Sequence, residues 1–152
     1  MAKFIYRMQS ILDLREKLEE SARNAFAEAR LRLDNEEEKL EALKARKAGY
    51  EEEGRRLRED VIDVLKIKEN SDAIERMKER IALQKIEVNK AAAFLEEARL
   101  NLQEAMKETK IQNKLKENAF EDFKRELIAE EMKEVDELTS YTYGQKKKEE
   151  QV

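Results

Sequence analysis

The stretch FIYRMQSILDLREKLEESARNA, residues 4–25, decides the fold of this chain. Apolar residues recur in it every seven positions, at Phe4, Ile11, Leu18 and Ala25. No proline or glycine interrupts the repeat. A seven-residue apolar repeat forms a stripe along one side of an α-helix, which a second helix has to cover. The stretch therefore predicts a helix with a packed partner, beginning almost at the first residue.

The apolar pattern continues toward the middle of the chain. After Ala25 the series slips by one residue and goes on as Phe26, Leu33 and Leu40. The slip is expected, because an undistorted helix drifts against a seven-residue repeat. Glu36 and Lys47 occupy seam positions and make the seam imperfect. The pattern predicts a first helix over residues of about 3–69.

The strongest break lies in KIKENSDAIERM, residues 66–77. Residues 70–72 are Asn, Ser and Asp, which form turns and cap helices. A second amphipathic run follows them. We therefore predict a turn at about 70–72, a second helix over about 73–142 and a frayed tail over about 144–152.

Two arms of nearly equal length joined by a short turn predict an antiparallel hairpin. The predicted fold class is all-α, a long antiparallel two-helix coiled coil that forms a single domain over residues 1–152. Facing residues would then have numbers that sum to about 141. This register pairs Leu18 with Phe123 and Phe4 with Leu138, so both chain ends would lie at the open end of the hairpin.

Gly49 and Gly54 flank Tyr50 inside the first arm. Each glycine should cost about 1 kcal/mol relative to alanine in a helix. They are interpreted as tolerated weak spots or, as the less favoured alternative, as a functional bend.

The composition excludes most catalytic and metal sites. Of the 152 residues 45% are charged, and the sequence contains no cysteine, histidine or proline. No thiolate or imidazole is therefore available as a ligand, nucleophile or general base. The Glu clusters, such as residues 51–53, point in different directions on a helix and indicate a solvated face. No glycine-rich phosphate loop is present. We predict no enzyme activity, cofactor or metal site.

Charge and hydropathy also limit the partners. The net charge is −4 with both signs interleaved, and no basic stripe predicts nucleic-acid binding. No run of 18 apolar residues predicts a membrane span. Polar residues near the N-terminus interrupt any signal-peptide core. The expected location is the cytoplasm, without direct membrane insertion.

Four aromatic residues belong to the predicted open end, where a two-helix hairpin has little core. They are Phe4, Tyr6, Tyr141 and Tyr143. They could pack on one another to close the end, or insert into a partner, because aromatic residues are favoured anchors in interfaces. Both interpretations stay open from the sequence.

The N-terminal stretch resembles the signature of the FliJ family. Members begin with an aromatic residue, a Tyr or Phe, a basic residue, a hydrophobic residue and a Gln, followed by L-x-L-R-E. The matching residues here are Phe4, Tyr6, Arg7, Met8, Gln9, Leu12, Leu14, Arg15 and Glu16. Met8 stands where leucine is commoner. Only the first twenty residues are distinctive.

The resemblance implies a component of the bacterial flagellar protein export apparatus, and hence a part in flagellum biogenesis and chemotaxis. FliJ proteins resemble the central-stalk coiled coil of rotary ATPases. The end with both termini is thought to sit in the ring of the export ATPase FliI and to promote its assembly. The family also contacts the export gate protein FlhA and cycles export chaperones. The implied location is peripheral, on the cytoplasmic face of the cell membrane at the flagellar base.

Carried over to this chain, the resemblance implies an ATPase-contacting end. Its residues would be Phe4, Tyr6, Arg7, Gln9, Leu12, Leu138 and Tyr141. Two alternatives remain: a structural or scaffolding coiled coil that dimerises through exposed stripes, and the equivalent stalk protein of a virulence-type secretion system.

Overall fold

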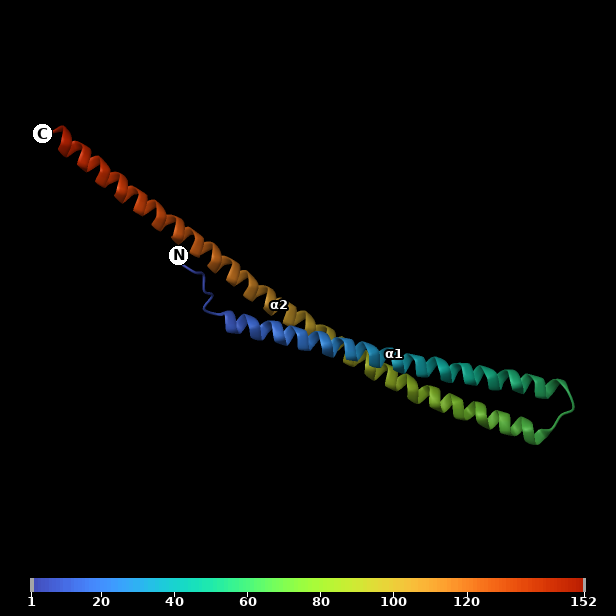
Figure 1. Ribbon diagram of the computed structural model, residues 1–152. Coiled ribbons are helices and arrows are strands. Elements are labelled where there is room, and N and C mark those ends of the chain that lie inside the picture. The colour runs from blue at the N-terminus through green and yellow to red at the C-terminus, as the bar shows by residue number, and fades with distance from the viewer. Residues whose placement is uncertain (1, 152) are drawn as a thin grey trace. The chain divides into compact units, whose positions relative to one another are not determined.

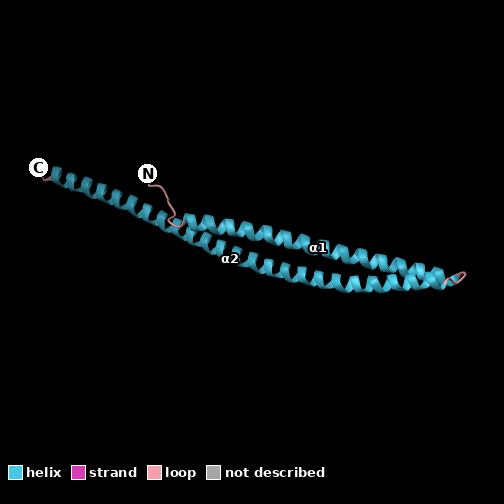
Figure 2. Cartoon of the chain, turned by 90° about the horizontal axis from the view of Figure 1, so that it is seen from below, coloured by secondary structure: helices cyan, strands magenta, loops and turns pink. Residues whose placement is uncertain are grey.

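The computed structural model describes residues 2–151, and this part of the chain contains two α-helices and no strand (Figure 1). Helix α1 spans Gln9–Glu59, 51 residues, and helix α2 spans Val64–Glu150, 87 residues. They run antiparallel, joined by a loop at residues 60–63 (Figure 2). The predicted all-α helical hairpin is confirmed.

The described residues form two compact units, which are considered separately below. Unit 1 consists of residues 2–18 and 106–151, and unit 2 is Glu19–Ala105. Unit 2 holds the loop between the helices. Unit 1 holds the N-terminal and C-terminal segments, and therefore every predicted site residue.

The turn lies about ten residues before its predicted position. The loop consists of residues 60–63, whereas residues 70–72 lie inside α2. Asp63 caps α2, because its Oδ1 accepts a hydrogen bond from the Leu65 backbone N–H at 3.1 Å. Val61 and Ile62 precede the cap, and β-branched residues have reduced helix propensity. The true break therefore carries a weaker turn signal than residues 70–72.

Asn70 is a seam residue of unit 2 and not a turn residue. Its side chain is buried, and its Nδ2 donates a hydrogen bond to the Tyr50 carbonyl oxygen at 2.8 Å. Gln84 makes the same kind of bond to the Glu36 carbonyl oxygen at 2.9 Å. Asn70 is buried and Gln84 is half-buried, and amides removed from water need hydrogen-bond partners, so these two bonds favour one alignment of the helices. The predicted register, with numbers summing to about 141, is wrong for unit 2.

Gln84 also hydrogen-bonds the Glu36 carboxylate through its Nε2. This hydrogen bond, together with the nearby Lys39 ammonium, lowers the pKa of Glu36 below 4.5. The polar seam position that looked like a defect in the sequence therefore forms part of the contact between the helices of unit 2.

Gly54 has a packing role that neither sequence interpretation included. A Cβ at this position would lie 2.5 Å from Asn70 Oδ1, closer than real Cβ contacts. Gly54 therefore leaves room for the Asn70 side chain that bonds Tyr50. A Cβ at Gly49 would have no neighbour within 4 Å, which fits the interpretation of Gly49 as a tolerated weak spot.

The core of unit 2 is built mainly of small side chains. Its buried apolar residues are Ala29, Ala73, Met77, Ala91 and Ala98. Small residues let two helix backbones approach closely while burying little area per residue. Unit 2 therefore depends on many small contacts and on its buried amides. None of the helices in residues 2–151 has the length and apolar character that a membrane crossing would need.

Both helix ends in unit 1 also differ from the predicted ones. Residues 2–8 are not helical, and α1 begins at Gln9. At the other end α2 continues to Glu150, beyond the predicted fraying point near Gly144. A single glycine costs a helix only about 1 kcal/mol, and the residues that follow Gly144 are good helix formers, namely Gln, Lys and Glu.

Candidate functional site

The nonhelical N-terminal segment, residues 2–8, packs on α2 through Phe4. The Phe4 ring lies 5.1 Å from the Phe120 ring and 5.5 Å from the Phe123 ring, measured between centroids. The first pair is edge-on, an arrangement that aromatic rings favour. Phe4 thus packs on two rings of α2 in the same chain. The sequence interpretation in which the four open-end aromatic residues pack on one another is not met, because Tyr141 and Tyr143 are exposed. The prediction that Phe4 lies beside Leu138 is wrong.

Tyr6 and Gln9 shape the entry into α1. The Gln9 backbone N–H donates to the Tyr6 carbonyl oxygen at 3.2 Å, and Gln9 Nε2 donates to Asp13 Oδ1 at 2.9 Å. The Tyr6 hydroxyl donates to Gln112 Oε1 at 3.5 Å, a long hydrogen bond. These contacts give Tyr6 and Gln9 a structural role at the start of α1. The Arg7 side chain is exposed.

Leu12 is a core residue of unit 1, with a side chain only 2% exposed. Nearby, the Arg15 carbonyl oxygen accepts a hydrogen bond from Thr109 Oγ1 at 3.2 Å. The Arg15 guanidinium lies 3.9 Å from the Glu108 carboxylate. These contacts align the start of α1 with residues 108–109 of α2. Leu12 is therefore in a position to support a binding surface, and its own side chain is covered.

The C-terminal part of α2 has no helix packed beside it. Every residue from 128 to 151 is exposed. Figure 1 shows this part, coloured orange to red, continuing past the N-terminal end of the chain. We call residues 128–150 the α2 extension. The extension exists because the early turn makes α2 much longer than α1.

Leu138 and Tyr141 lie on this extension, each with 66% of its surface exposed. The Tyr141 hydroxyl accepts a hydrogen bond from Gln145 Nε2 at 2.9 Å, within the same helix. Tyr143 is similarly exposed. The structure therefore separates the predicted site residues into two groups. Phe4, Tyr6, Gln9 and Leu12 pack within unit 1, whereas Leu138 and Tyr141 are uncovered, and so is Arg7.

The packed face of α2 in unit 1 follows a 3–4 spacing. Its less exposed residues include Lys116, Ala119, Phe123 and Leu127. The same spacing continued past Leu127 reaches glutamates at positions 130, 134 and 137. The packed face thus becomes acidic where α1 no longer covers it.

A different apolar face replaces it on the extension. We call it the extension stripe, and it consists of Ile128, Met132, Val135, Thr139 and Thr142. Each member is one or two residues out of step with the packed face, and a helix turns by about 100° per residue. The apolar side of α2 therefore points in a new direction beyond Leu127.

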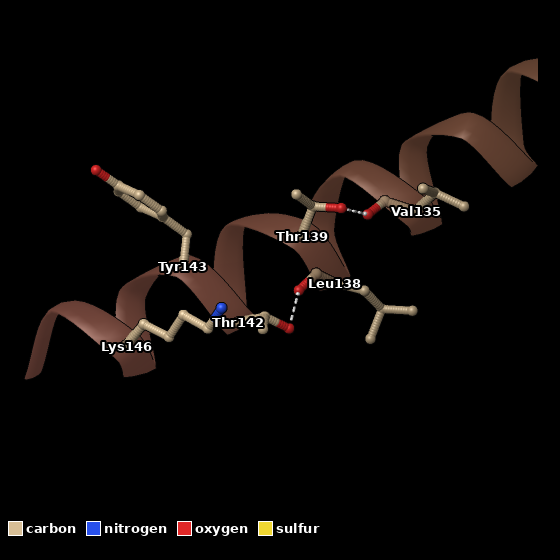
Figure 3. Close-up of a pocket in the computed structure, with 6 residues that line it drawn as sticks. All are labelled: Val135, Leu138, Thr139, Thr142, Tyr143 and Lys146. Carbon is tan, nitrogen blue, oxygen red and sulfur yellow. Dashed lines mark hydrogen bonds between the residues drawn. The ribbon is translucent and has the colours of Figure 1, made fainter. Parts of the chain in front are cut away.

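Internal hydrogen bonds make the stripe more apolar than its residue types suggest. Thr139 Oγ1 donates to the Val135 carbonyl oxygen at 2.8 Å, and Thr142 Oγ1 donates to the Leu138 carbonyl oxygen at 2.9 Å (Figure 3). Both hydroxyls are used within the helix. A shallow hollow follows this face, lined by Val135, Leu138, Thr139, Thr142, Tyr143 and Lys146.

A second hollow lies where residues 3–8 meet α2. It is lined on the α2 side by Ala119, Asp122, Phe123 and Glu126. Among residues 2–151, no group of three or more acidic side chains is arranged to hold a metal ion. The two hollows of unit 1 combine apolar side chains with flanking charges, as contact surfaces do.

Sequence reasoning missed the partners of Phe4 and the extension stripe. The seven-residue repeat predicts one continuous apolar face, whereas the apolar face of α2 changes beyond Leu127. The signal was present, because Ile128, Met132 and Val135 repeat at spacings of four and three.

An antiparallel pair of long helices, with no strand among residues 2–151, defines a class of protein, the helical coiled-coil proteins. Within that class the chain belongs to a particular family: the sequence profile described as "Flagellar FliJ protein" matches residues 4–148. The match includes the N-terminal segment and nearly all of α2. The resemblance noted in the sequence is therefore confirmed, and the chain belongs to the FliJ family of flagellar proteins.

A solved structure with a similar fold is that of a putative YscO homolog from Chlamydia trachomatis. The TM-score is 0.63 at 21% sequence identity, and the similarity covers 96% of this chain and 99% of that one. At this identity the likeness concerns the fold alone. No curated protein matches the chain.

Proposed function

We propose that this chain is a non-enzymatic component of the flagellar export apparatus that docks its open end into the ring of the export ATPase FliI. Docking promotes assembly and activity of the ring. The observation that carries the proposal is the family match over residues 4–148, which includes most of both segments of unit 1.

The contact surfaces of unit 1 suit this role in two different ways. Leu138 and Tyr141 are uncovered and can enter a partner directly, whereas Phe4 and Tyr6 are engaged within the chain. We infer that the α2 extension makes the direct contact, together with the exposed Arg7. Phe4, Gln9 and Leu12 hold the N-terminal segment in place beside it.

The remaining parts of the proposal follow from the family. We infer that the chain also links the ATPase to the export gate protein FlhA and cycles export chaperones. It would work in the cytoplasm, peripherally associated with the membrane at the flagellar base.

The proposal is tested by ATP hydrolysis of the cognate FliI with and without the purified chain. Stimulation and co-purification are expected. The double variant L138E/Y141E should lose most of the stimulation, because two charges would have to be buried in the contact. Absence of both stimulation and co-purification with the wild-type chain would contradict the proposal.

The matched control is Leu83→Glu in unit 2. Leu83 has the same 66% exposure as Leu138 and undergoes the same chemical change. Stimulation should survive this substitution. Loss of stimulation in the control would place the contact elsewhere on the chain or indicate general damage.

A scaffolding role is the second candidate, and the exposed extension stripe favours it, because uncovered apolar stripes support helix pairing. A scaffold would form a stable dimer and would leave ATP hydrolysis by FliI unchanged. The same ATP hydrolysis assay separates the two candidates.

A further inference from the structure

We propose that the free chain associates with a second copy of itself through the extension stripe, with the two α2 extensions antiparallel. This inference goes beyond the proposed function. It concerns what covers the extension when no other partner is bound.

The first argument is the direction of the stripe. Its apolar residues repeat at spacings of four and three, the pattern of a helix that packs against one other helix. Met132 and Val135 are 63% and 60% exposed, so nothing in unit 1 covers them. Past Leu127, the packed face of α2 continues with glutamates at positions 130, 134 and 137. A longer α1 would therefore meet these glutamates and would not cover the extension stripe.

The second argument is charge, and it selects the direction of pairing. Residues 128–137 contain five carboxylates and one lysine, whereas residues 138–150 contain three lysines and two glutamates. An antiparallel pair places the acidic half of each extension beside the basic half of the other. A parallel pair would place acidic halves together, and like charges at that distance destabilise an interface.

The third argument is that the stripe matches itself when reversed. An antiparallel register centred on residue 137 pairs Ile128 with Lys146, Met132 with Thr142, and Val135 with Thr139. The methylene groups of Lys146 can cover Ile128 while its ammonium stays in water.

The size of this contact indicates weak association. The matched segment from position 128 to position 146 is about 28 Å long at 1.5 Å per residue. Interfaces of permanent dimers are larger and more apolar than two helices of this length provide. We therefore expect a concentration-dependent equilibrium between monomer and dimer.

Sedimentation equilibrium of the full-length chain over a wide concentration range measures this association directly. The wild type should shift from monomer toward dimer as its concentration rises. The double variant M132E/V135E should associate at least about tenfold more weakly than the wild type, because association would bury charge in the central layers. Both residues are exposed in the free chain, so the hairpin should fold normally by circular dichroism.

Ala129→Glu is the matched control. Ala129 is exposed on the same helix and lies about 100° away from the centre of the stripe. Its dimerisation should equal that of the wild type. A chain that remains monomeric at every concentration, or a dimer that M132E/V135E leaves intact, would overturn the proposal.

The absence of cysteine allows the direction to be tested by disulfide trapping. Under mild oxidation Ile128→Cys mixed with Lys146→Cys should form a cross-linked dimer, and neither variant alone should do so. Efficient cross-linking of Ile128→Cys with itself would show parallel pairing and overturn the antiparallel assignment. These measurements use the chain alone, so their failure would leave the ATPase proposal standing.

Discussion

Residues 106–127 and residues 128–150 belong to one continuous helix of unit 1, yet they differ in what covers them. The first segment packs on residues 2–18 through Thr109, Phe120 and Phe123. The second segment is exposed throughout. The two segments have similar apolar content, and their apolar residues lie on different faces.

This difference shows that a helix can change its partner without changing its secondary structure. Beyond Leu127, where the N-terminal segment no longer covers α2, its packed face becomes acidic and a new apolar stripe begins. The paired segment should therefore govern the stability of unit 1, and the extension should govern its contacts with other molecules. Each prediction below tests one part of this division.

The largest expected effect is that of Leu12→Ala. Leu12 is almost fully buried in the paired segment, so its truncation should lower the free energy of unfolding by about 2–3 kcal/mol. Leu138→Ala on the extension should change it by less than about 0.5 kcal/mol. Urea denaturation followed by circular dichroism measures both. Equal losses of unfolding free energy in the two variants would contradict the division between a paired segment that stabilises unit 1 and an extension that does not.

Phe4→Ala should have the next largest effect, about 1–2 kcal/mol, because the ring loses its contacts with Phe120 and Phe123. Tyr143→Ala, which removes an exposed ring from the extension, is the matched control and should be nearly neutral. Protection of Phe120 and Phe123 from hydroxyl-radical labelling reports on the packing itself. Unchanged labelling in Phe4→Ala would show that the ring cluster does not persist in solution.

The two helix glycines should respond in opposite directions. Gly54→Ala should destabilise unit 2 by about 1 kcal/mol, because the new Cβ displaces Asn70 from its buried hydrogen bond to Tyr50. Gly49→Ala should stabilise the helix by up to about 1 kcal/mol. Thermal unfolding distinguishes the two variants. Stabilisation by Gly54→Ala would contradict the role assigned to Asn70.

The smallest effect concerns pH. The pKa of Glu36 is lowered in the folded chain by its hydrogen bond from Gln84 and by Lys39. The stability this provides is present above the unfolded pKa and is lost as the pH falls through the lower, folded pKa. Glu36→Gln should therefore reduce the acid sensitivity of unfolding below pH 4.5. If the pH profile of unfolding is the same in Glu36→Gln as in the wild type, the Glu36 contact does not contribute to the pH dependence of stability.

The sequence allowed the fold class and family to be predicted, because the seven-residue repeat and the N-terminal signature are local patterns. It did not allow the turn position to be predicted. Asn70 and Asp72 have the residue types of a turn, and only the presence of Tyr50 opposite shows that the Asn70 amide is hydrogen-bonded in a seam. Because the turn was misplaced, the register was wrong as well.

The same error affected the site. The predicted pairing of Phe4 with Leu138 depended on the register, whereas Phe4 contacts Phe120 and Phe123. The choice of Leu138 and Tyr141 as contact residues stays a prediction, now with a physical reason: both are uncovered. The change of apolar face beyond Leu127 could have been found by following each face separately.

The central claim, that the α2 extension is the contact surface of this chain, is tested most directly by amide hydrogen exchange with and without FliI. Residues 128–150 should exchange much faster than residues 106–127 in the free chain, because no other element covers them. Addition of the ATPase should slow exchange in the extension above all. Protection confined to unit 2, with the extension unchanged, would contradict the account.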